Sequence, residues 1–87
     1  MKIIFLKRFD RSYNKLADKD QQAIRKAIEK FFQESKPSSL RIKKMEGQDE
    51  IFEMSANMDL RITFHFEKPD MIMFRNCGHH DITLNNP

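Results

Sequence analysis

Leu60-Arg-Ile-Thr-Phe-His-Phe-Glu67 is the stretch of this sequence that decides the fold. Apolar and polar residues alternate along it without a break, so the two sets of side chains point to opposite faces of an extended strand. A period of two is typical of a half-buried β-strand. The stretch therefore predicts a strand with an apolar face, which includes Phe66, turned to the core and a polar face that carries Arg61 and His65.

Two further short strands flank this stretch, and turn residues separate them from it. Residues 51–56 precede it across the turn at 57–59, and residues 71–77 follow it across the turn at 68–70. Adjacent strands that are joined by short turns pair antiparallel. The second half of the chain therefore predicts a three-stranded antiparallel meander, whose polar face also displays Glu53.

The first forty residues predict the elements that cover the apolar face of this meander. Residues 2–8 are apolar enough for a short strand, and helical spacing begins at Phe9. From residue 18 an apolar stripe predicts a second, longer helix, which Pro37 ends. We expect one α+β domain over residues 1–87, with the order β-α-α-β-β-β, a helical hairpin packed on the sheet, and the first strand beside a later one.

Positive charge is concentrated in the first part of the chain. Residues 1–50 hold thirteen Lys and Arg against eight Asp and Glu, a net of +5, whereas residues 51–87 hold three against five, a net of −2. A basic half favours an anionic partner, either nucleic acid or an acidic protein. Residues 36–44 form a basic connector, which is either a phosphate-binding surface or an ordinary solvated loop.

The cysteine count and the hydropathy favour a cytoplasmic protein. A single cysteine excludes an internal disulfide framework and suits a reducing cytosol. No apolar run approaches the roughly 18 residues that a membrane span needs. The short apolar stretch after Met1 ends at a basic pair, so we predict neither a signal peptide nor a membrane partner.

The end of the last strand carries the residues best suited to proton transfer. Gly78 is followed by His79, His80 and Asp81. Imidazole is the only side chain whose unperturbed pKa lies near 6.5, so it can give and take protons at neutral pH. With the cations of the polar sheet face and of the connector, these residues supply a base, an acid and phosphate-binding groups, which metal-independent RNA cleavage requires. The plainer alternative is that the two histidines only end a strand.

A metal site at Cys77, His79 and His80 is the competing interpretation. Adjacent residues of an extended segment point to opposite faces, so the two histidines cannot easily share an ion. The sequence contains no second cysteine, and we predict neither a metal nor another cofactor. Cys77 continues an apolar strand, and burial there makes it a poor nucleophile.

The order of the elements and four stretches of sequence resemble the RelE/ParE superfamily of type II toxin–antitoxin toxins. The stretches are Pro37-Ser-Ser-Leu-Arg-Ile-Lys-Lys-Met-Glu-Gly47, Ile51-Phe-Glu-Met54, Leu60-Arg-Ile-Thr-Phe64 and Arg75-Asn-Cys-Gly-His-His-Asp81. The resemblance implies a RelE/ParE-like fold and a ribosome-dependent mRNA endonuclease that inhibits translation. It also implies a cognate antitoxin, which binds the toxin in a hetero-oligomer. The alternatives are a ParE-like toxin that acts on DNA gyrase and a non-catalytic binding or regulatory domain of the same fold.

The resemblance also implies roles for individual residues. Arg61 matches a position that engages the RNA backbone, His80 with His79 beside it matches a C-terminal residue that transfers a proton or stabilises charge, and Glu53 is the nearest match to a strand glutamate that acts as a base. We expect Asp81 to assist the imidazole. The residues expected to bind RNA phosphate are Arg41, Lys43, Lys44, His65 and Arg75.

The sequence departs from the superfamily in one respect. Many members carry an aromatic residue near the C-terminus, which stacks on a base or joins catalysis, and its place falls here at Thr83 or Leu84. Neither side chain can stack as an aromatic ring does. This departure either favours the gyrase toxin or the non-catalytic domain, or it implies a branch that relies on the His-His-Asp segment at 79–81.

Overall fold

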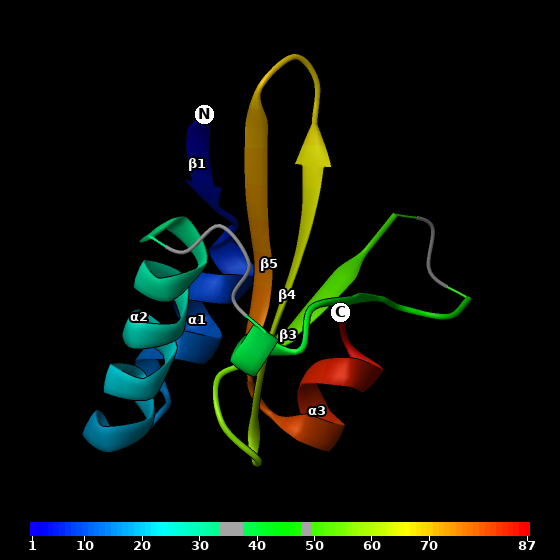
Figure 1. The fold of residues 1–87 in the computed structure, drawn as a ribbon. Coiled ribbons are helices and arrows are strands. Elements are labelled where there is room, and N and C mark those ends of the chain that lie inside the picture. Colours follow the sequence, from blue (N-terminus) through cyan, green and yellow to red (C-terminus); the bar gives the residue numbers. More distant parts are fainter. Residues whose placement is uncertain (34–37, 48–49) are drawn as a thin grey trace.

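The computed structural model describes residues 1–33, 38–47 and 50–87 (Figure 1). In chain order its elements are β1 (Lys2–Phe5), α1 (Lys7–Asn14), α2 (Asp18–Gln33), the 3-10 turn η1 (Ser38–Leu40), β2 (Lys43–Lys44), β3 (Phe52–Ser55), β4 (Leu60–Glu67), β5 (Met71–His79) and α3 (His80–Asn85). The predicted α+β class and the predicted order are confirmed, and β2 and α3 are additions to it. No helix in the described ranges is long and apolar enough to cross a membrane.

One five-stranded mixed sheet forms the centre of the molecule. The strand order is β1-β5-β4-β3-β2, and β1 runs parallel to β5, where Ile3 is aligned with Ile72. The other neighbouring pairs are antiparallel. The predicted meander is therefore β3-β4-β5, and the first strand lies beside a later one, as expected. The helical hairpin is the crossover that a parallel pair needs, because a short turn cannot join parallel strands.

The helical hairpin α1–α2 covers one face of the sheet (Figure 1). Phe9 of α1 lies 6.1 Å from Phe74 between ring centroids, and Phe31 of α2 lies 5.4 Å from Phe64. The alternation in β4 predicts this core, since Leu60, Ile62 and Phe64 are at most 1% exposed. Full burial of a side chain of this size contributes about 1.5–3 kcal/mol.

The burial predicted for Phe66 is wrong. Its side chain is 45% exposed, because the β4–β5 hairpin extends beyond the helices that cover the sheet (Figure 1). Phe66 keeps ring contacts with Phe52 and Phe64 at 5.8 and 5.7 Å. An exposed aromatic residue therefore marks the outer end of the hairpin.

The opposite face of the sheet is covered in part by α3 and the residues that follow it. Thr63 and Asn76 on this face are 0% and 4% exposed, and Glu53 is 8% exposed. The prediction that this face displays Glu53 is therefore wrong. The sequence pattern gave no reason to expect α3, because it is short and follows the last strand without a break.

Gly78 makes the close approach of α3 possible. Its φ is +145°, and a Cβ atom built on it would lie 3.1 Å from Oγ1 of Thr83. A left-handed φ of this kind is readily adopted only by glycine. The chain therefore turns from β5 directly into α3, so that His80 becomes the first residue of a helix.

The basic connector is less regular than an extended strand. Arg41 has a φ of +49°, and only Lys43 and Lys44 pair with β3. Arg41 and Lys43 therefore do not share the face of a regular strand, as an extended connector would require. Pro37, which was predicted to end the second helix, lies outside the described residues.

Candidate functional site

Two hollows lie on either side of the turn between β3 and β4. The first has a volume of about 260 Å³ and is lined by Ser39, Arg41, Ser55, Asn57, Met58 and Arg61. The second has a volume of about 340 Å³ and is lined by Asp59, His79, His80, Asp81 and Ile82. Residues of the same turn therefore line both hollows, Asn57 and Met58 the first and Asp59 the second.

Arg61 is fixed by the backbone of this turn. Its Nη1 donates to the carbonyl oxygens of Asn57, Met58 and Leu60 at 2.8, 3.1 and 3.0 Å. No described residue bonds to Nε or Nη2, so these donors remain available to a ligand. Arg41 lines the same hollow, and two guanidinium groups beside serine hydroxyls are suited to an anion such as a phosphate.

His80 stands at the other side of the turn with one ring nitrogen engaged. Its Nδ1 lies 2.8 Å from Oδ1 of Asp81, and its backbone N–H donates to the carbonyl of Asp59 at 2.8 Å. A carboxylate accepts, so Nδ1 carries the hydrogen. No described residue bonds to Nε2, and the side chain is 49% exposed. Nε2 is therefore free to exchange a proton with a bound molecule.

His79 lines the same hollow as His80 and also reaches the second helix. Its Nε2 lies 3.7 Å from Oδ2 of Asp20 at the start of α2. The two adjacent histidines thus pair with different elements, as alternation at the end of a strand predicts. Within the described ranges no group of three or more His, Cys, Asp or Glu residues is placed to hold a metal ion.

A second polar cluster lies at the outer part of the β4–β5 hairpin. Arg75 donates from Nη1 to Nδ1 of His65 at 2.9 Å and from Nε to the carbonyl of Pro87 at 2.9 Å. Because arginine only donates, Nδ1 of His65 is the acceptor, and Nε2 donates to Glu67 at 3.1 Å. Both ring nitrogens of His65 are therefore occupied. A hollow of about 530 Å³ lies beside these residues, and Lys44 and Phe66 also line it.

Arg75 belongs to a set of bonds that hold the segment after α3. The carbonyl of Pro87 also accepts from Oγ1 of Thr63 at 3.2 Å, and the carbonyl of Asn86 accepts from Nδ2 of Asn76 at 2.8 Å. These bonds explain why Thr63 and Asn76 are buried polar residues. Arg75 therefore has a structural role that its place in the sequence does not reveal.

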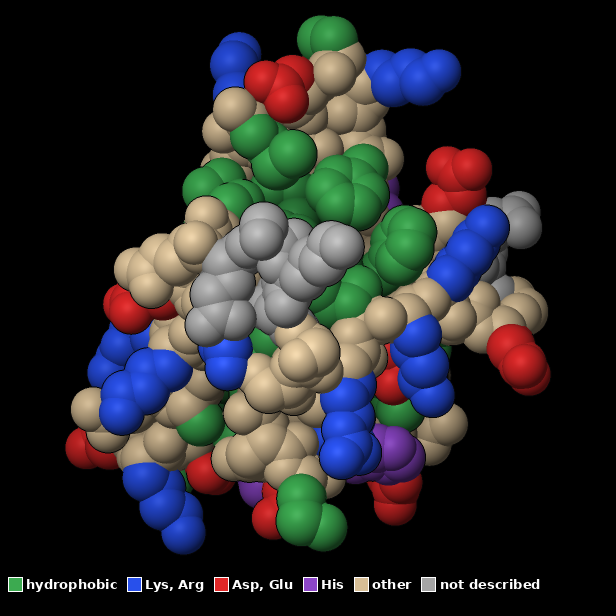
Figure 2. Space-filling model, in the orientation of Figure 1, with side chains coloured by type: hydrophobic (Ala, Val, Ile, Leu, Met, Phe, Trp, Pro, Cys, Tyr) green, Lys and Arg blue, Asp and Glu red, His purple; other side chains and the backbone are tan. Residues whose placement is uncertain are grey.

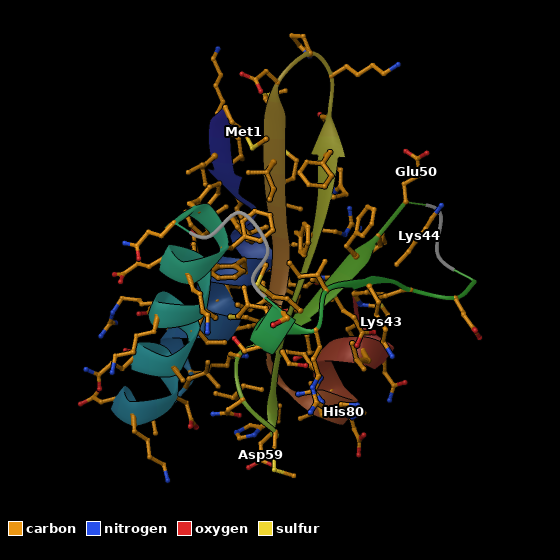
Figure 3. All side chains as sticks on the ribbon, viewed as in Figure 1. Met1, Lys43, Lys44, Glu50, Asp59 and His80 are labelled. Carbon is orange, nitrogen blue, oxygen red and sulfur yellow. The ribbon has the colours of Figure 1, made fainter. Side chains whose placement is uncertain are left out.

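The remaining predicted site residues lie on or beside the short strand β2. Lys43 and Lys44 are exposed, and Lys43 is aligned with Glu53 across the β2–β3 pair. Figure 2 shows Lys and Arg side chains on both sides of the visible face, and on the right a histidine lies below them; Figure 3 labels Lys43, Lys44 and His80 on that side. Glu53 itself is buried, so its carboxylate is not presented to a large ligand.

Cys77 is not a nucleophile in this fold. The side chain is 2% exposed, and Sγ donates to the carbonyl of Phe9 at 4.0 Å. Burial, with a smaller contribution from the charge of Asp10, raises the pKa of the thiol from 9.0 to about 12. The group is therefore a protonated thiol at neutral pH.

The structure places eight of the ten predicted site residues in two groups, whereas Lys43 and Glu53 belong to neither. Around the β3–β4 turn it brings together Arg41, Arg61, His79, His80 and Asp81. It places His65 and Arg75 in the hairpin cluster, whose hollow Lys44 also lines.

Asn57 and Asp59 line the site and were not predicted as site residues. In the sequence they read only as turn formers, and no local pattern distinguishes a turn that carries a site from one that does not. The signal that could have identified them is their position immediately before Arg61.

No protein-family model matches the sequence, and no curated protein matches it either. Solved structures do match. YafQ from E. coli strain BL21(DE3) is 12% identical, with a TM-score of 0.74 over 94% of this chain and 96% of that chain. A chain of the RelB–RelE antitoxin–toxin complex from Methanococcus jannaschii is 23% identical, with a TM-score of 0.72 over 97% and 99%. The YoeB/ParE toxin from Agrobacterium tumefaciens is 10% identical, with a TM-score of 0.74 over 92% and 99%.

At these identities the likeness establishes the fold. Nearly the whole of each chain is covered, so the predicted RelE/ParE-like fold is confirmed.

Proposed function

We propose that this chain is the toxin of a type II toxin–antitoxin system and acts as a ribosome-dependent, metal-independent mRNA endonuclease. The observation that carries the proposal is the pairing of the Arg41–Arg61 hollow with His80 across one turn. The fold alone supports several functions, so the site must decide between them. A phosphate-binding hollow next to a half-exposed imidazole with a free nitrogen favours phosphodiester cleavage.

Each group has a chemical role in this proposal. Arg61 and Arg41 hold the scissile phosphate and stabilise the charge that develops in the transition state. Nε2 of His80 transfers the proton, either from the attacking 2′-hydroxyl or to the leaving 5′-oxygen, and Asp81 orients the ring through Nδ1. The exposed Lys43 and Lys44 bind the RNA backbone beyond the cleaved bond.

The buried Glu53 is not part of this proposal. A general base must come within hydrogen-bond reach of the proton it removes. Asp59 and Asp81 are the carboxylates that line the His80 hollow, both are exposed, and Asp81 already bonds Nδ1 of His80. We therefore propose His80 or Asp59 as the general base, and not Glu53.

The expected protein partner is an antitoxin with an acidic, amphipathic segment. The net charge of +5 in residues 1–50 favours such a partner, and the similar chain from Methanococcus jannaschii comes from an antitoxin–toxin complex. Co-expression with the neighbouring reading frame, followed by purification through a tag on this chain, should recover a complex. Recovery of this chain without a partner would count against a toxin.

Mapping the 5′ ends of cellular mRNA after induced expression is the decisive experiment. New ends within translated frames, absent in cells that express His80→Ala, are the expected result. Growth arrest with intact mRNA and broken chromosomal DNA would instead indicate action on DNA gyrase. Normal growth at a verified level of folded protein would indicate a non-catalytic domain.

A further inference from the structure

The side chain of Asn57 holds the turn that separates the two hollows. Its Oδ1 accepts the backbone N–H groups of both Asp59 and Leu60 at 2.9 Å. The N–H of Ala56 donates to the carbonyl of Leu60 at 3.0 Å and closes the same turn. An asparagine that bonds the backbone two and three residues ahead replaces part of a turn's own hydrogen bonding.

The carbonyl groups of this turn bond the side chain of Arg61 and the backbone of His80. The carbonyls of Asn57, Met58 and Leu60 face Nη1 of Arg61. The carbonyl of Asp59, between them, accepts the N–H of His80 and so fixes the start of α3. The four consecutive carbonyls therefore accept hydrogen bonds from two residues of different elements, Arg61 of β4 and His80 of α3.

We propose that Asn57 is a positioning residue that sets the geometry of Arg61 relative to His80. The inference rests on the function proposed above, because it concerns the same site. Asn57 acts through the turn, and it need not touch the reacting atoms. A displacement of about 1 Å at a reacting group can reduce the rate by about 10²-fold, so a residue that fixes such a geometry has a measurable effect on the rate.

The first test does not depend on catalysis. Amide exchange of the purified protein, followed by NMR, reports the His80 N–H, and the Nε–H signal of Arg61 reports the guanidinium. In Asn57→Ala the His80 amide should lose about 10-fold or more of its protection and the Arg61 signal should move, since their shared support is loosened. Asn57→Asp keeps an acceptor oxygen and should retain the wild-type protection.

Asn85→Ala is the matched control for this test. Asn85 is an exposed asparagine at the end of α3, and no described residue bonds to its side chain. Its removal should leave the His80 amide and the Arg61 signal unchanged. Wild-type protection and an unmoved Arg61 signal in Asn57→Ala would overturn the proposal.

The second test is a double-mutant cycle in the cleavage of ribosome-bound mRNA. Asn57→Ala alone should lower kcat by about 10- to 100-fold with little change in KM, because geometry is lost rather than substrate contact. In the Arg61→Ala background the same change should cost only about 2- to 5-fold, since residues that act through one another are not additive. Equal losses in both backgrounds would overturn the proposal.

The two tests also separate this inference from the proposed function. If the wild-type protein cleaves no mRNA, the proposed function fails, and the NMR measurement alone decides whether Asn57 fixes Arg61 and His80. If the protein cleaves mRNA and Asn57→Ala cleaves at the wild-type rate, the function stands and the role of Asn57 is refuted.

Discussion

Two regions of this molecule each bring an arginine, a histidine and a carboxylate together, and they differ in how many polar atoms are already bonded. At the β3–β4 turn Arg61 bonds only backbone carbonyls, and His80 has one ring nitrogen engaged. In the hairpin cluster Arg75 bonds His65 and the backbone of Pro87, and both nitrogens of His65 are engaged.

We propose that hydrogen-bond occupancy, rather than residue type, separates the reactive groups from the structural ones in this chain. A histidine whose two nitrogens are bonded must break a bond before it can transfer a proton. Arg61 keeps both Nε and Nη2 unbonded to described residues, whereas Arg75 already donates from Nε and from Nη1, so no pair of its nitrogens stays wholly available to two oxygens of a phosphate. We therefore assign chemistry to the turn region and stability to the hairpin cluster.

The largest expected effect concerns one histidine from each region, His80 at the turn and His65 in the hairpin cluster. His80→Ala should lower the cleavage rate by about 10²- to 10⁴-fold, the range for one acid–base group, and leave antitoxin binding intact. His65→Ala should change the rate by about 3-fold or less, because neither of its nitrogens is free. Single-turnover cleavage of ribosome-bound mRNA measures both. Equal losses in the two variants would remove the distinction between the regions.

The two arginines give the next largest effect. Arg61→Ala should lower the cleavage rate by about 10²-fold. The slope of log affinity for RNA against log salt concentration should fall by about 1, the value for one lost phosphate contact. Arg75→Ala should instead lower the free energy of unfolding by about 1–3 kcal/mol, because the carbonyl of Pro87 and Nδ1 of His65 lose the donor that Arg75 supplies. Cleavage per folded molecule should stay within about 3-fold. If this slope changed in Arg75→Ala and not in Arg61→Ala, Arg75 rather than Arg61 would be the phosphate-binding residue.

Gly78, which precedes His79 and His80, leads to a prediction about stability rather than cleavage. Gly78→Ala should destabilise the fold by about 1–3 kcal/mol, because it combines a strained φ with a contact on buried Thr83. Gly47→Ala is the control, since Gly47 also has a positive φ, of +72°, and nothing lies within 4 Å of its Cβ position. Urea unfolding of both variants measures the difference. Identical losses would show that α3 does not depend on close packing against Gly78.

Most of the fold could be predicted from the sequence because the pattern and the packing agree. The alternation in β4 and the apolar stripe in α2 each identify a face that must be buried. The parallel pairing of β1 with β5 could be expected only in outline. The exposure of Phe66 could not, because it depends on how far the helices extend over the sheet.

Residue types in the site could be predicted, whereas their partners could not. His80 and Asp81 are adjacent in the sequence, so their contact could be expected. The contact of Arg75 with His65 depends on the register of β4 against β5, which shifts between Thr63 and Phe64. The burial of Glu53 likewise depends on residues far along the chain. A single sequence does not specify such contacts, and they decide which candidates remain available to a ligand.

The smallest predicted effect concerns Cys77, which lies on β5 between Arg75 and Gly78 and serves neither region. Its pKa is raised to about 12 in the folded chain, against 9.0 as the ordinary value, so the unfolded chain ionises first as the pH rises. The stabilisation is therefore complete below pH 9 and is lost progressively above it, at about 1.4 kcal/mol per pH unit. Cys77→Ala should lack this loss and should retain cleavage, since no step requires a thiol. Urea unfolding of the wild type and of Cys77→Ala at pH 8 and at pH 10 measures the loss of unfolding free energy in each. The contributions of the other groups that titrate in this range are common to both proteins and cancel in the comparison. Rapid alkylation of the folded wild-type protein at pH 8 would contradict the assignment, because a thiol with that pKa and 2% exposure should react only after the chain unfolds.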